Sequence, residues 1–319
     1  MTNDGVIFPR VVGSVAAGLD TGLDTGLDTG LDTGLDTGLR RGIGQCEVTH
    51  RFARALYLRV GPQLICIGDL SIGCGALNVL VSPADWATLG SVLDAGAMLG
   101  VGCPTTFPCV SLPAPVVGSG IYWLDFQHAL PWRAPHVPLD MLPCAQSVAF
   151  ARDVLAREPG CAQLGPPGGG DRIQGRVQAQ AQARVQVGVH ALVQWLTTLG
   201  HAPVPESVTR LLGTGPGLTP AGDDVLVGVL LALKPPIRAR LANALRGLWS
   251  IATTQISVAH LTAAAQGEGA HVAHVALAAL YAVPGAGLER ALRALLALGQ
   301  SSGRHCLLGM LTVLEGDLK

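Results

Sequence analysis

Apolar residues in the first half of the chain form short runs that alternate with turn residues. Residues 56–60 and 64–68 are two β-branched and leucine-rich runs separated by Gly61-Pro62-Gln63, a spacing typical of a β-hairpin. Further strands are expected at residues 6–16, 76–81 and 116–126. Ser82, followed by a proline, predicts the start of a short helix. Residues 42–143 should therefore be mostly β-structure.

Apolar residues in the second half recur with the period of a helix. Helices are expected at residues 142–158, 181–199, 237–252, 256–266, 271–282, 288–298 and 306–314. The fold class predicted from this change of pattern is α+β. It has a β-rich domain at 1–158, a Pro/Gly linker at 159–175 and an all-helical domain at 176–319.

A perfect tetrapeptide repeat interrupts the first domain. Residues 19–38 are five copies of Leu-Asp-Thr-Gly, in which glycine and aspartate occupy half of the positions. Such a composition favours a flexible loop or disorder, because the segment cannot bury enough apolar surface to fold. We interpret the repeat as an insertion after the first strand.

One glycine-rich stretch, residues 213–224, stands before the most apolar helix of the chain. It reads Gly-Thr-Gly-Pro-Gly-Leu-Thr-Pro-Ala-Gly-Asp-Asp, and residues 225–233 after it are apolar on every side, as in a buried helix. Thr219 is expected to be the N-cap of that helix. Asp223 and Asp224 then fall near its first turn, so two carboxyl groups and free backbone N–H groups should meet at one helix N-terminus.

This arrangement is a candidate anion site, although it is not a nucleotide P-loop, because Leu-Thr follows Gly217 where Lys-Ser/Thr is required. We expect both aspartates to be ionised at neutral pH. One would face a pocket, where it holds Mg²⁺, fixes an arginine or orients an amide N–H, and the other would tie down the glycine loop. The alternative is a capped helix after a glycine turn, with no ligand.

A second stretch, Gly-Gln-Ser-Ser-Gly-Arg-His at 299–305, also precedes an apolar helix. Ser301 or Ser302 is expected to cap that helix, and either serine can also contact a ligand. His260 lies among small residues and is interpreted as a hydrogen-bonded histidine rather than a base. His271 and His274 lie one helical turn apart and could bind a metal, but without a carboxylate beside them we interpret them as part of a solvated helix face.

Composition limits the classes of function. The 319 residues are 49% hydrophobic and 13% charged, and the net charge is −1, so neither nucleic acid nor an anionic membrane is an expected partner. None of the eight cysteines forms a C-x-x-C pair. The first twelve residues lack a signal-peptide pattern, so a cytoplasmic protein with reduced thiols is expected.

Residues 215–224 resemble the signature of the AllH-like family, and residues 299–303 look like the second motif of that family. The resemblance implies a subunit of a multi-subunit carbamoyltransferase, which converts oxalurate and phosphate to oxamate and carbamoyl phosphate in purine-ureide (allantoin) catabolism. It also implies partner subunits, one of them related to acyl-CoA synthetases. The family commonly has histidine where this chain has Gln300, and aspartate where it has His305. These differences affect the expected reaction more than the expected fold.

The predicted site combines the two motifs. Asp223 and Asp224 are the catalytic candidates. The candidates for binding substrate or phosphate are Gly213, Gly215, Gly217, Thr219, Gln300, Ser301, Ser302 and Gly303. His260 and His305 are further candidates. No metal site is predicted, and Mg²⁺ is the one candidate cofactor. The alternative functions are a non-catalytic scaffold subunit and a binder of small carboxylates or phosphate.

Overall fold

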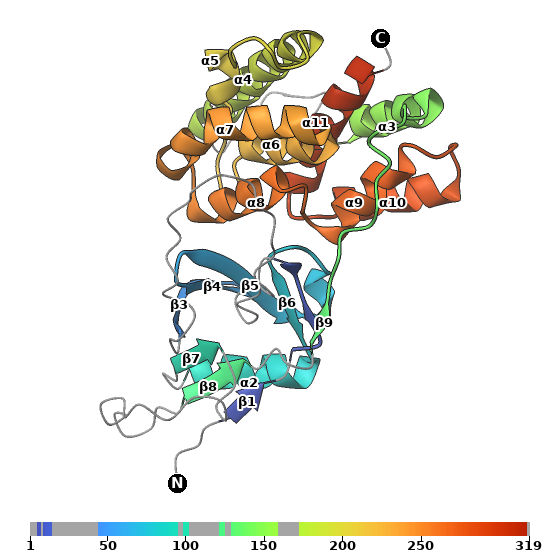
Figure 1. Cartoon of the computed structure of the whole chain (residues 1–319). Coiled ribbons are helices and arrows are strands. Elements are labelled where there is room, and N and C mark those ends of the chain that lie inside the picture. The colour runs from blue at the N-terminus through green and yellow to red at the C-terminus, as the bar shows by residue number, and fades with distance from the viewer. Residues whose placement is uncertain are drawn as a thin grey trace. The chain divides into compact units, whose positions relative to one another are not determined.

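The chain divides into two compact units, Met1–Arg133 and Ala134–Lys319. The computed structural model (Figure 1) describes residues 5–7, 9–14, 44–94, 98–101, 121–124, 129–158 and 172–317. The repeat at 19–38 and most of the expected linker lie outside these residues. The division falls earlier than residue 158, because the helix at 145–157 packs against the last helix of the second unit.

The described part of the first unit is built on one mixed sheet. Its strands are β1 Gly5–Ile7, β2 Val11–Val12, β3 Gly44–Arg51, β4 Ala55–Val60, β5 Gln63–Asp69, β6 Asn78–Val81, β7 Met98–Val101, β8 Ile121–Leu124 and β9 Leu130–Pro131. They follow the order β1-β8-β7-β3-β4-β5-β6-β2-β9. The hairpin expected at 56–68 is confirmed as the antiparallel pair β4–β5. The single strand expected at 6–16 is wrong, because β1 and β2 pair with different strands.

The apolar core of this unit is formed largely by side chains of β4, β5 and β6. β4 alternates half-buried and buried residues, whereas the centre of β5 is buried on both faces. Leu89, on helix α2 (Pro83–Asp94), completes the core. The start of α2 is capped as expected, since the Ser82 hydroxyl accepts from the backbone N–H of Asp85 at 3.1 Å.

Helices are the regular secondary structure of the described residues of the second unit, and loops connect them. Its helices are α3 Ala145–Arg157, α4 Arg172–Thr197, α5 Glu206–Thr209, α6 Ala221–Ala232, α7 Pro235–Ala252, α8 Gln255–Ala265, α9 His271–Ala279, α10 Ala286–Leu296 and α11 Ser302–Asp317. With the sheet of the first unit, they confirm the α+β class. Figure 1 shows α6 among α7, α8 and α11, and ten of its twelve residues are buried. No helix of the described residues is long and apolar enough to cross a membrane.

Two glycines let α6 and α11 cross with their backbones in contact. A Cβ atom on Gly228 would lie 1.9 Å from the carbonyl oxygen of Cys306, and one on Gly309 would lie 2.1 Å from that of Val225. Any larger side chain would force the helices apart. This close packing holds the N-terminus of α11 beside the N-terminus of α6.

Candidate functional site

Asp223 fixes the glycine loop onto the start of α6. Its side chain is 1% exposed, Oδ1 accepts from the backbone N–H of Gly213 at 2.9 Å, and Oδ2 accepts from the hydroxyl of Thr253. Burial raises the pKa of Asp223, while hydrogen bonds from Thr253, Gly213 and Ser257 oppose that rise. Both carboxyl oxygens are therefore engaged in holding the loop.

Asp224 has a different environment, although it is the next residue of the helix. Its side chain is 8% exposed, and its Oδ2 is buried without a hydrogen-bond partner. Burial raises the pKa of Asp224 to about 7; the hydroxyls of Ser302 and Thr219 lower it, and the charge of Asp223 raises it further. The expectation that both aspartates are fully ionised at neutral pH is thus wrong for Asp224, because burial outweighs the helix dipole.

The glycine loop turns by backbone conformations that other residues rarely adopt. Gly213 has φ 68° and Gly215 has φ 120°, and a Cβ atom on either would lie within 3 Å of backbone atoms. Gly217 has φ 98° at the exposed tip, with open space around its Cβ position. Gly213 and Gly215 therefore shape the loop, and the backbone N–H of Gly213 is already bonded to Asp223.

The N-terminus of α6 differs from the open anion site expected from sequence. Pro220, not Thr219, is the N-cap, because the helix begins one residue later than expected. The N–H of Gly222 donates to the Thr214 carbonyl at 2.9 Å, and those of Asp223 and Asp224 donate to the Pro220 carbonyl. These donors are consumed within the protein and are not available to a ligand.

The side chain of Thr219 instead points to a second helix. Its hydroxyl lies 2.9 Å from that of Ser302, the first residue of α11. One residue earlier in the loop, the carbonyl of Leu218 accepts from the hydroxyls of Thr254 and Ser257 at the start of α8. The N-termini of α6, α8 and α11 thus converge on residues 218–219.

The remaining residues of the second motif are less engaged. Gln300 and Ser301 are exposed at the surface of the second unit. Gly303 is buried, donates its N–H to the Leu298 carbonyl at 3.0 Å, and would place a Cβ atom 1.8 Å from the Leu295 carbonyl. Gly303 is therefore a packing residue between α10 and α11, whereas Ser302 lies in the site.

The two candidate histidines are neutral at pH 7. Burial lowers the pKa of His260 to about 4 and, together with the charge of Arg304, lowers that of His305 to about 4. The thiol of Cys306 interacts with the carboxyl pair, and its pKa is raised by burial and by the charge of Asp224. Neither histidine has the protonation behaviour of a base that works near neutral pH.

Sequence reasoning missed two hydroxyls of the site, Thr253 and Thr254. Thr254 is the N-cap of α8, where its hydroxyl accepts from the N–H of Ser257 at 3.1 Å. A threonine three residues before Ser257, at the start of a small-residue helix, was a recognisable capping signal. The contact of Thr253 with Asp223 joins positions 30 residues apart in the chain, which no local pattern reveals.

The aspartate pair does not have the form of a metal site. Within the described ranges, no three His, Cys, Asp or Glu side chains gather closely enough to hold a metal ion. Asp223 uses both oxygens on protein donors, so the carboxyl group of Asp224 is the part of the pair left for a cation. A hard cation such as Mg²⁺ needs six oxygen ligands around it. The candidate Mg²⁺ therefore gains no support from these residues.

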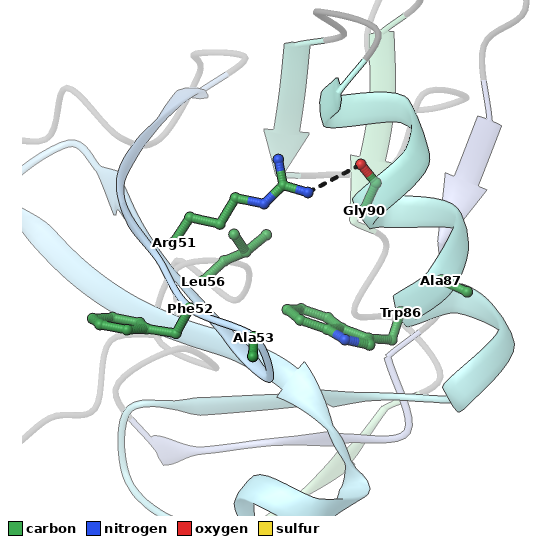
Figure 2. Close-up of a pocket in the computed structure, with 7 residues that line it drawn as sticks. All are labelled: Arg51, Phe52, Ala53, Leu56, Trp86, Ala87 and Gly90. Atoms are coloured by element: carbon green, nitrogen blue, oxygen red, sulfur yellow. Dashed lines mark hydrogen bonds between the residues drawn. The ribbon is translucent and has the colours of Figure 1, made fainter.

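A separate pocket of about 250 Å³ lies in the first unit, between the β3–β4 turn and α2 (Figure 2). It is lined by Arg51, Phe52, Ala53, Leu56, Trp86, Ala87 and Gly90. The Arg51 guanidinium donates to the Gly90 carbonyl at 3.3 Å. This hydrogen bond connects the end of β3 to α2 across the pocket. None of the residues predicted from sequence lines this pocket.

The second unit is thus a helical domain. In it, three helix N-termini meet at a buried pair of carboxyl groups that is surrounded by hydroxyl groups. Residues 211–314 match the family described as oxamate carbamoyltransferase subunit AllH. The matched stretch contains both motifs and every residue of the site, so the resemblance to the AllH-like family is confirmed there. No curated protein and no solved structure matches the chain.

Proposed function

We propose that the chain is a subunit of a carbamoyltransferase-type enzyme, which converts oxalurate and phosphate to oxamate and carbamoyl phosphate in purine-ureide breakdown. The observation that supports this most is the coincidence of the family match at 211–314 with the cluster formed by Thr219, Asp224 and Ser302. The family is named as a subunit, and we propose that this chain also works with other subunits, including one related to acyl-CoA synthetases, in the cytoplasm.

The cluster suits a small, polar acyl group. Transfer of a carbamoyl group passes through a tetrahedral oxyanion, which hydrogen-bond donors stabilise when they are fixed before the reaction. The hydroxyls of Thr219 and Ser302 are held 2.9 Å apart at the N-terminus of α11, where the helix dipole also favours negative charge. We propose that the ligand binds on this side of α6, and that Asp223 holds the loop that carries Thr219.

The test is ligand-dependent stabilisation of the full chain, alone and with its partner subunits. Oxamate, oxalurate, phosphate and carbamoyl phosphate are added in turn, and a ligand that binds only the native state raises Tm. We expect carbamoyl phosphate or oxamate to raise Tm, and Thr219→Val to abolish that shift. Thr262→Val is the matched control, because the Thr262 hydroxyl bonds only the carbonyl of Val258 in its own helix at 2.7 Å.

Three results would separate the possible functions. A Tm shift together with carbamoyl phosphate formation by the assembled subunits supports the enzyme. A shift without any effect of Thr219→Val on turnover by the assembly would make the chain a binder of small carboxylates. No shift with any of the four compounds, and wild-type turnover by the Thr219→Val assembly, would leave a scaffold subunit and overturn the proposed function.

A further inference from the structure

The two neighbouring aspartates differ in how their oxygens are satisfied. Asp223 accepts through both oxygens, from Gly213 and from Thr253. Asp224 is more than nine-tenths buried, yet its Oδ2 has no hydrogen-bond partner, while Thr219 and Ser302 act on the same carboxyl group. A buried polar atom without a partner costs about 1–3 kcal/mol, so it marks a place where a ligand can supply the missing contact.

The groups around Asp224 offset only part of the cost of burying a negative charge. Asp223 precedes it on α6, and the charge of Asp223 raises the pKa of Asp224, while the charge of Asp224 raises the pKa of the Cys306 thiol on α11. Thr219 in the loop and Ser302 on α11 contribute hydroxyl dipoles, and Ser257 on α8 acts on Asp223. An ionised carboxylate buried among such groups is costly, whereas the neutral acid is not.

We propose that Asp224 meets the ligand as a neutral carboxylic acid, with the hydroxyl on Oδ2 donating to a carbonyl or carboxylate oxygen of the ligand. A neutral acid has one O–H donor in addition to its accepting oxygen. The proton on Oδ2 is then the donor that the protein leaves unpaired. An amino group offered to this atom would place donor against donor, so the site selects an acceptor oxygen.

We infer that a ligand approaches Asp224 on the side of Thr219 and Ser302, whose hydroxyls act on its carboxyl group. Thr219 and Ser302 are half-buried, and the residues just before Thr219 are exposed. The 2.9 Å contact between the two hydroxyls is the contact that entry of a ligand would break, and each hydroxyl can then bond the ligand instead. Three donors, from Asp224, Thr219 and Ser302, would surround one small anionic group.

This inference rests on the proposed function, because the probe is oxamate, and it has a distinctive pH dependence. Oxamate binding to the full chain, with its partner subunits present, is measured by calorimetry from pH 5.5 to pH 8.5. A carboxyl group such as that of oxamate stays ionised over this range. The pKa of Asp224 is about 7, so its neutral form is lost above that pH. We expect the affinity to fall about tenfold for each pH unit above 7.

Asp224→Asn is the matched variant, because an amide keeps a donor in the same place and does not titrate. We expect oxamate to bind this variant with an affinity that is flat with pH. A second readout needs no ligand: the infrared C=O band of a protonated carboxyl group at pH 6 should disappear in Asp224→Asn and persist in Asp223→Asn.

The outcomes distinguish the two proposals. Affinity that is constant in the wild type, or that rises with pH, would overturn the role of Asp224 as a donor but leave the proposed function intact. An unchanged infrared band in Asp224→Asn would overturn it as well, independently of oxamate. No binding of oxamate at any pH would overturn the proposed function, and with it this role of Asp224.

Discussion

The two sides of the first turn of α6 differ in how completely their polar groups are paired. On the side of Asp223, the carboxyl oxygens, the Gly213 N–H and the Thr253 hydroxyl satisfy one another. On the side of Asp224, one buried oxygen is left over beside Thr219 and Ser302. Adjacent residues on a helix point about 100° apart, so one turn can hold a structural network on one side and a ligand site on the other.

The largest difference in stability between the two sides is expected when each carboxyl group is removed in turn. Asp223→Ala leaves the Gly213 N–H and the Thr253 hydroxyl without their partner, so we expect a loss of about 3 kcal/mol in the free energy of unfolding. Asp224→Ala at pH 8 should lose less, because it also removes a carboxyl group that ionises unfavourably when buried. Urea unfolding of both variants measures the difference, and equal losses would contradict the division of roles.

The loop itself offers a second comparison, between two glycines with positive φ. In Gly213→Ala the new Cβ atom would lie 2.1 Å from the Ala252 carbonyl, whereas in Gly217→Ala it would lie in open space. We expect a loss of about 2–3 kcal/mol for Gly213→Ala and about 1 kcal/mol for Gly217→Ala. Thermal unfolding of the pair checks this, and a larger loss for Gly217→Ala would show that the loop is packed differently.

Stability should depend on pH through Asp224. The pKa rises from its ordinary value of 3.8 to about 7 on folding, so the native state holds the proton more tightly than the unfolded chain. The associated stability is present at low pH and is lost as pH rises through 7. Between pH 5 and pH 7 the wild type should lose on the order of 2 kcal/mol relative to Asp224→Asn. Parallel pH profiles for the two proteins would contradict the raised pKa.

The smallest effect is expected far from this turn. Deletion of residues 19–38, the Leu-Asp-Thr-Gly repeat, should change Tm little, because the repeat has little apolar surface to bury. Differential scanning calorimetry of the deletion variant is the measurement. A fall in Tm comparable to that of Gly213→Ala would show that the repeat contributes to the folded structure.

Local patterns were sufficient for the fold class and for the elements on which the candidate site lies. The alternation in 56–60 and the uniformly apolar 225–233 predicted a strand and a buried helix, because each pattern follows directly from which faces are covered. The sequence also brought Asp224 and Ser302 into one predicted site. The assignment rested on two motifs far apart in the chain that both precede apolar helices.

The details of the site depend on contacts that no local pattern contains. Thr253 reaches Asp223 from the end of α7, and the donors at the start of α6 are consumed by Thr214 and Pro220. The protonation of Asp224 depends on how deeply α11 covers α6, which the packing of Gly228 and Gly309 decides. Helix-dipole reasoning alone favoured an anion, and it failed because burial is the larger effect here.

The most direct test of the central claim, that Asp223 holds the loop and Asp224 serves the ligand, is a crystal structure of the full chain with carbamoyl phosphate bound. We expect a ligand oxygen at about 2.5–3.0 Å from Oδ2 of Asp224. Thr219 and Ser302 should bond the same ligand, and the contacts of Asp223 with Gly213 and Thr253 should be unchanged. Carbamoyl phosphate bound against Asp223, or at the glycine loop with Asp224 still buried and untouched, would contradict the account.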